Sequence, residues 1–193
     1  MAEDRLITLD RAGLKALYHS QITPTFPPAE RRPLRAMLRL LDQGVYHPLA
    51  LVRGEDVLAY ALLWRDRESG YALLDYLGVC PSCRGQGVGS ALLRAVLETC
   101  REVCLLAEVE APGAHLPQET NRLRTRRLDF YRRAGFSVLP YEADIFRVRY
   151  VMLTSGDPQD AAGAMAAHIR LYRTEFSPLA YRRMVHIPSA SEE

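Results

Sequence analysis

The sequence predicts an α/β fold of the α+β kind: a central mixed, mostly antiparallel twisted sheet flanked by helices, with a C-terminal helical extension. Three observations lead to this prediction. An apolar run of strand type at 71–79 passes through a glycine-rich turn into a leucine-rich helical pattern. Two strand-type runs, 46–52 and 57–64, precede it and predict an antiparallel meander. An alanine-rich helical pattern at 161–176 follows the last strand-type run.

Length and composition favour one globular domain with a terminal extension. The chain has 193 residues, of which 48% are hydrophobic and 25% charged, which allows a sizeable core and argues against extended disorder. We predict a domain at 1–155 and a helical extension at 156–193. No apolar run approaches the ~20 residues that span a bilayer, and the N-terminal ten residues include acids and no signal-type apolar region. We therefore expect a cytoplasmic protein with no membrane partner.

The first part of the chain reads as strand, helix, loop and helix. Residues 6–9 predict the first strand, and Asp10 is suited to cap the helix that follows. A loop rich in Thr and Pro at 20–28 separates this helix from a second one, whose apolar spacing stops at Gly44.

The second part of the chain also alternates between predicted strands and helices. We predict a strand at 103–109, a loop at 111–119, a helix from about 121 to 134 with Thr120 as its cap, strands at 137–143 and 146–153, and a frayed tail at 189–193.

The glycine-rich turn predicts a phosphate-binding loop. Gly85, Gly87 and Gly89 remove side chains from a helix entrance, where backbone N–H groups lack partners and the helix dipole is positive. A phosphate can bind there directly. A dinucleotide fingerprint requires a glycine where Ser90 stands, and a nucleotide P-loop requires a lysine that is absent. A turn that binds no ligand is the alternative.

This stretch resembles motif A of the GNAT superfamily of N-acetyltransferases, whose signature is Arg/Gln-x-x-Gly-x-Gly/Ala. The sequence here is Arg84-Gly85-Gln86-Gly87-Val88-Gly89, after a strand ending Leu77-Gly78-Val79 and before Ser90-Ala91-Leu92-Leu93. The resemblance covers about residues 5–153 and implies the GNAT acyltransferase fold with acetyl-CoA (coenzyme A) as cosubstrate and no metal. It implies that the following residues bind the cofactor: Leu77, Val79, Arg84, Gly85, Gln86, Gly87, Val88, Gly89 and Ser90.

A second segment resembles GNAT motif B, in which a helix carries a tyrosine four residues before a Gly-Phe pair. Here Tyr131 precedes Gly135-Phe136 at that distance. The resemblance implies that Tyr131 is the general acid, because a phenol is protonated at neutral pH and can donate to a thiolate. A tyrosine that covers the coenzyme or fills the core is the alternative.

Three carboxylates are candidates for the general base. Asp75 lies inside an apolar strand, while Glu108 and Glu110 share one face at the end of the next strand. A carboxylate in an apolar strand is unfavourable unless it has a partner or a function. We rank Glu108 first and Asp75 second. The glutamates also suit recognition of a cationic acceptor or an exposed strand end, and deprotonation through water would require neither.

Cysteines and arginines leave further alternatives open. Cys80, Cys83, Cys100 and Cys104 could form a zinc-stabilised interaction domain or a redox pair, but their spacing favours reduced thiols and no metal site. An arginine-rich run at 122–133 predicts a solvated helix face, or a surface for the coenzyme 3′-phosphate or an acidic partner. The net charge of +2 is too small to predict nucleic-acid binding.

Two functional hypotheses follow. The first is an acetyl-CoA-dependent N-acetyltransferase acting on a primary amine of a small molecule or a protein, with an unidentified acceptor. The second is a non-catalytic acyl-CoA-binding regulatory module on the same fold. The resemblance makes residues 21–30 a candidate for acceptor contact. The extension packs either on its own sheet or on a second subunit, so a homodimer is left open.

Overall fold

The computed structural model of the chain describes residues 3–28 and 31–188, which form two compact units. Unit 1 runs to Arg65 and includes Leu74–Thr99, whereas unit 2 comprises Asp66–Leu73 and the residues from Cys100 onward. The predicted tail at 189–193, and residues 29 and 30 of the predicted acceptor segment, lie outside the described residues.

The described strands form one mixed sheet, as predicted. They are β1 Asp4–Thr8, β2 Tyr46–Arg53, β3 Asp56–Arg65, β4 Tyr71–Val79, β5 Cys104–Glu110, β6 Ser137–Ile145, β7 Val148–Thr154 and β8 Val185–His186. The order in the sheet is β1-β2-β3-β4-β5-β7-β6-β8. Strands β4 and β5 pair in parallel, from Tyr71 with Cys104 to Leu73 with Leu106. Five further pairs are antiparallel: β1–β2, β2–β3, β5–β7, β6–β7 and β6–β8.

The helical elements in chain order are α1 Arg11–Leu17, the π-helix η1 Tyr18–Ile22, α2 Thr23–Thr25, α3 Leu34–Asp42, the 3-10 turn η3 Pro81–Cys83, α4 Val88–Thr99, α5 Gln118–Arg133, α6 Ala161–Glu175 and α7 Pro178–Met184. Among the described residues, no helix has the length and apolar character needed to cross a membrane.

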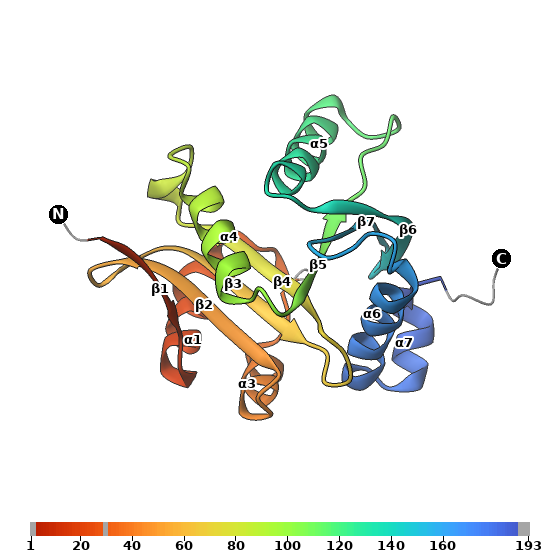
Figure 1. The fold of residues 1–193 in the computed structure, drawn as a ribbon, viewed down its shortest axis with the longest axis horizontal. Helices are drawn as coiled ribbons and strands as arrows, with labels where there is room; N and C mark the ends of the chain where they lie inside the picture. Colours follow the sequence, from red (N-terminus) through yellow and green to blue (C-terminus); the bar gives the residue numbers. More distant parts are fainter. Residues whose placement is uncertain (1–2, 29–30, 189–193) are drawn as a thin grey trace. The chain divides into compact units, whose positions relative to one another are not determined.

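Unit 1 buries both faces of its central strands. Most residues of β2 and β3 are buried, because α3 packs on β2 and α1 while α4 packs on β1, β2 and β3 (Figure 1). Asp10 caps α1 as predicted, since its carboxylate accepts a hydrogen bond from the Gly13 N–H at 2.7 Å. Trp64, Tyr46 and Tyr60 are among the largest fully buried side chains. The core of this unit therefore lies directly under the strands that lead to the glycine-rich turn.

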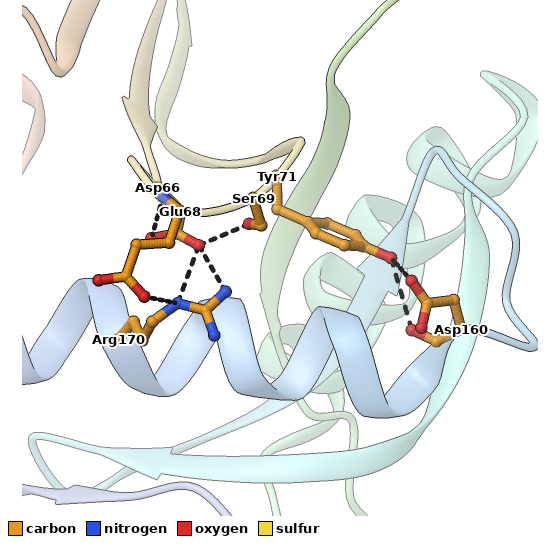
Figure 2. Close-up of polar contacts among 6 residues, drawn as sticks. All are labelled: Asp66, Glu68, Ser69, Tyr71, Asp160 and Arg170. Atoms are coloured by element: carbon orange, nitrogen blue, oxygen red, sulfur yellow. Dashed lines mark hydrogen bonds and ion pairs between the residues drawn. The ribbon is translucent and has the colours of Figure 1, made fainter.

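Unit 2 contains the C-terminal extension as an integral layer. Helices α6 and α7 lie side by side (Figure 1), and α6 is tied to the segment that enters β4 (Figure 2). The Tyr71 hydroxyl donates to the Asp160 carboxylate at 2.7 Å. Arg170 pairs with Asp66 at 2.7 Å. Strand β8 then pairs with β6.

Three local predictions were wrong, and one strand was missed. The predicted loop at 20–28 is helical as far as Thr25. Helix α5 begins at Gln118 rather than after Thr120, because the fixed φ of Pro117 suits the residue preceding a helix. The strand predicted from residue 146 begins at Val148, since Phe146 and Arg147 form the hairpin turn with φ of 51° and 69°. Strand β8 was not predicted.

Candidate active site

The turn between β4 and α4 presents backbone N–H groups without partners inside the protein. Gly85 and Gly87 have φ of 76° and 78°, a region that residues with side chains rarely adopt. A Cβ atom built on either glycine would meet no heavy atom within 4 Å. Within the described part of the chain, no backbone N–H from Gly85 to Gly89 donates a hydrogen bond. Because these groups lie at the start of a helix of 12 residues, they can bind an anion.

Two side chains of the turn donate hydrogen bonds to nearby backbone carbonyls. Arg84 donates from Nε to the Val79 carbonyl at 3.3 Å, and Gln86 donates from its amide to the Ser82 carbonyl at 2.9 Å. The Ser90 N–H donates to the Gly87 carbonyl at 3.0 Å. The predicted cofactor residues from 84 to 90 therefore form one continuous segment, a turn at 84–87 followed by the first three residues of α4. Unpaired donors beside the open faces of Gly85 and Gly87 fit a diphosphate group.

The end of β4 passes close to an aromatic ring. A Cβ atom at Gly78 would lie 2.2 Å from Cζ of Tyr60 on β3, so a side chain at position 78 would clash. Burial raises the pKa of Tyr60 to about 12, which keeps its hydroxyl protonated at neutral pH. Leu77 and Val79 flank Gly78 and are half-buried. Tyr60 was not predicted, although a glycine inside a strand signals close approach of another group.

Asp75 is held by residues of unit 1. Arg32 donates to both of its carboxylate oxygens, at 3.0 and 3.3 Å, and the Tyr46 hydroxyl donates at 2.5 Å. The Arg32 guanidinium also lies 4.3 Å from the ring centroid of Trp64. The Tyr76 hydroxyl accepts from the Arg32 backbone N–H at 2.8 Å. Asp75 therefore anchors the segment before α3.

Burial, and then the Asp75 charge, raise the pKa of Tyr46 well above its ordinary value. This tyrosine therefore stays a hydrogen-bond donor to Asp75. Neither Arg32 nor Tyr46 was predicted to take part in the site.

Two arginines of α5 bind the Glu110 carboxylate. Arg124 donates to one of its carboxylate oxygens at 2.8 Å, and Arg127 donates to the other at 2.6 Å. Arg124 also donates to the Ala111 carbonyl at 3.0 Å. Two members of the arginine-rich run therefore fix the end of β5 to α5, and each oxygen of Glu110 accepts a hydrogen bond from an arginine.

Glu108 is held on one oxygen only. His168 and Tyr172, both on α6, contact Oε1 at 2.9 Å each. The side chain of Glu108 is 16% exposed and that of His168 is 0% exposed. In the residues that the structure describes, no hydrogen bond involves Oε2 of Glu108. Of the three predicted carboxylates, only Glu108 has an oxygen that accepts no hydrogen bond within the described residues.

Tyr131 lies near the C-terminal end of α5, half-buried between two aromatic rings. Its ring centroid is 5.3 Å from those of Phe130 and Phe136. Burial raises its pKa to about 12, although the Arg127 charge acts in the opposite direction. Its hydroxyl is therefore protonated at neutral pH, the state in which it can donate a proton.

The predicted site residues divide between the two units. Unit 1 contains Asp75, the end of β4 and the glycine-rich turn, and unit 2 contains Glu108, Glu110 and Tyr131. His168 and Tyr172 were not predicted. Their spacing of four residues places both on one helical face, which signals a shared partner but does not identify it.

The four cysteines are free thiols, and Cys80 donates to the Val57 carbonyl at 3.0 Å. Over residues 3–28 and 31–188, no group of three or more His, Cys, Asp or Glu side chains could hold a metal ion.

Residues 14–136 match the sequence model of a family described as the acetyltransferase (GNAT) family. This match covers more than half of the chain and includes the glycine-rich turn and Tyr131. No curated protein sequence matches the chain.

Solved structures share the fold at low sequence identity. A protein from Bacteroides thetaiotaomicron assigned to the GNAT acetyltransferases is 19% identical with a TM-score of 0.69, over 89% of this chain and 98% of that one. The ribosomal-protein-S18-alanine N-acetyltransferase from Escherichia coli is 18% identical with a TM-score of 0.57, over 79% and 92%. A Bacillus subtilis acetyltransferase in complex with CoA is 13% identical with a TM-score of 0.54, over 79% and 97%.

Proposed function

Because this chain belongs to the GNAT acetyltransferase family, we propose that it is an N-acetyltransferase that transfers an acetyl group from acetyl-CoA to a primary amine of a small molecule or a protein. The observation that carries the proposal is the row of unpaired N–H groups from Gly85 to Gly89 beside two open glycine faces. Such a row is complementary to the negative charge of a diphosphate.

Residues of unit 1 would hold the cofactor. The turn from Arg84 to Ser90 binds the diphosphate, and the backbone of Leu77 and Val79 aligns the pantetheine arm. Gly78 keeps this end of β4 free of a side chain that would meet Tyr60. When bound, acetyl-CoA supplies an acetyl group activated as a thioester.

Residues of unit 2 would move the protons. Transfer forms a bond between the amine nitrogen and the acetyl carbon while the thioester C–S bond breaks. Glu108 takes the proton that the amine nitrogen loses, and Tyr131 gives a proton to the leaving sulfur. Solvent then carries a proton from Glu108 to Tyr131, so both residues return to their starting states.

Titration calorimetry tests the cofactor site. Acetyl-CoA and desulfo-coenzyme A are titrated into wild type, Gly89→Glu and Gly89→Gln. Gly89 does not have a positive φ, so a side chain there causes no strain of that kind. We expect micromolar binding to wild type. Gly89→Glu should weaken binding about tenfold more than the uncharged Gly89→Gln, because like charges repel.

An acceptor screen tests the reaction. Thiol release from acetyl-CoA is followed with spermidine, an aminoglycoside, free amino acids and a peptide with an N-terminal alanine. No binding of either coenzyme by folded wild type would contradict the proposal. Binding without thiol release over the whole panel would instead favour a non-catalytic acyl-CoA-binding module.

A further inference from the structure

A buried polar cluster joins β5 to α6 inside unit 2. His168 has 0% exposed surface. Its Nε2 lies 2.9 Å from Oε1 of Glu108, and its Nδ1 lies 3.4 Å from the Tyr141 hydroxyl. The Tyr172 hydroxyl donates to the same Glu108 oxygen at 2.9 Å. Because an ionised carboxylate only accepts hydrogen bonds, Nε2 carries a hydrogen and donates it to Glu108.

This cluster holds the carboxylate asymmetrically. Both donors contact Oε1, whereas Oε2 takes part in no hydrogen bond within the described residues. Asp75 and Glu110, in contrast, accept hydrogen bonds on both oxygens. Two donors on one oxygen fix the plane of the carboxylate and leave the lone pairs of the other available for a proton.

The cluster also lies at a defined point of the sheet. The parallel ladder between β4 and β5 ends at the pair Leu73 and Leu106, and Glu108 lies two residues further along β5. On its β4 side Glu108 has no paired residue among those described, and on its other side it pairs with Met152 of β7, whose thioether has no hydrogen to donate to a carboxylate. The donors on α6 therefore provide the orientation.

We propose that His168 and Tyr172 are positioning residues, supplied by the C-terminal extension, which orient Glu108 to take the proton of the acceptor amine. This inference rests on the proposed function. It assigns a catalytic task to an extension that lies outside the matched family region, which ends at residue 136.

A purely structural role for the cluster is the competing explanation, and the chain offers a matched control. Tyr71→Phe removes a hydroxyl that binds Asp160 at the start of α6 (Figure 2). Tyr172→Phe likewise removes a hydroxyl of α6 that binds Glu108. Each variant removes a side-chain hydroxyl that holds the same helix, but only Tyr172→Phe changes the contacts of Glu108.

Steady-state kinetics with the best acceptor of the panel, calorimetric Kd for acetyl-CoA and thermal midpoints are measured for the full chain. We expect Tyr172→Phe to lower kcat about tenfold, as small misplacement of a reacting group does, with Kd unchanged. Tyr71→Phe should leave kcat unchanged. In a Glu108→Gln background, adding Tyr172→Phe should lower kcat no further, because the oriented base is already absent.

His168 gives an independent comparison. His168→Gln keeps an N–H donor and should retain more activity than His168→Leu. If both His168 variants unfold, the comparison of Tyr172→Phe with Tyr71→Phe still tests the inference. Equal kcat for Tyr172→Phe and Tyr71→Phe, or additive losses in the Glu108→Gln background, would overturn the inference while leaving the proposed function intact. Absence of acetyl transfer by wild type would overturn both.

Discussion

At the scale of single residues, a neighbouring side chain leaves no room for a side chain at Gly78. A Cβ atom there would lie 2.2 Å from Cζ of Tyr60, and a ring with 1% exposure cannot move without disturbing the core. We expect Gly78→Ala to lower the free energy of unfolding by about 1–3 kcal/mol, the usual effect of overpacking. Urea unfolding followed by circular dichroism measures it.

Gly70→Ala is the matched control for this prediction. The nearest heavy atom to its Cβ position is the Glu102 carbonyl oxygen at 4.0 Å, so the same substitution meets no obstacle. Equal stability of the two variants would show that the Tyr60 ring yields and that position 78 does not require glycine.

Asp75 is a second residue whose contribution to the stability of the fold can be measured. Its ion pair with Arg32 is buried, with side chains 12% and 10% exposed. Asp75→Asn keeps the shape of the side chain but removes the negative charge that the buried Arg32 guanidinium contacts. We expect a loss of about 3 kcal/mol in the free energy of unfolding, measured by urea denaturation.

The exposed pair of Asp4 and Arg53 provides the comparison, because Asp4→Asn should change stability little. If Asp75 is instead the general base, Asp75→Asn would lower kcat and leave the unfolding curve in place.

At the level of secondary structure elements, α6 is held to the turn before β4 by an acid-sensitive contact (Figure 2). Burial raises the pKa of Asp66, but hydrogen bonds from Arg170 and Ser69 outweigh it and leave the pKa below its ordinary value. Such a carboxylate stabilises the fold above its unfolded pKa, near 4, and the stabilisation is lost as pH falls through the folded value.

We therefore expect the urea midpoint of wild type to fall between pH 5 and pH 3, and Asp66→Asn to show a shallower fall. Asp42→Asn, at the exposed pair with Arg11, should retain the wild-type dependence. Parallel pH curves for wild type and Asp66→Asn would show that this contact does not contribute to acid stability.

These elements also show which features could be read from the sequence. The bounds of β4 were predicted as 71–79 because its apolar run ends sharply at both sides. The glycine-rich turn with its unpaired N–H groups could be predicted because these donors are backbone groups within one short stretch. The partners of the carboxylates could not, because Arg32 is 43 residues from Asp75 and His168 is 60 residues from Glu108. Only folding places them together.

For the whole molecule, helix α6 of the C-terminal extension contributes to the core of unit 2. Helix α6 buries the following side chains: Ala164, Ala167, His168, Leu171 and Tyr172. A chain ending at residue 155 would expose the apolar surface beneath them and leave Glu108 and Asp66 without their partners.

We therefore expect residues 1–155 to lack a folded unit 2, whereas residues 1–176 should fold with reduced stability, because they retain α6 and lose only α7 and β8. Removing a helix that covers one face of a sheet exposes apolar area and unsatisfied polar groups together. Amide NMR spectra of both truncations, with thermal unfolding, measure the difference. Dispersed wild-type shifts for β5, β6 and β7 in the shorter chain would show that the sheet of unit 2 forms without α6, which would contradict this prediction.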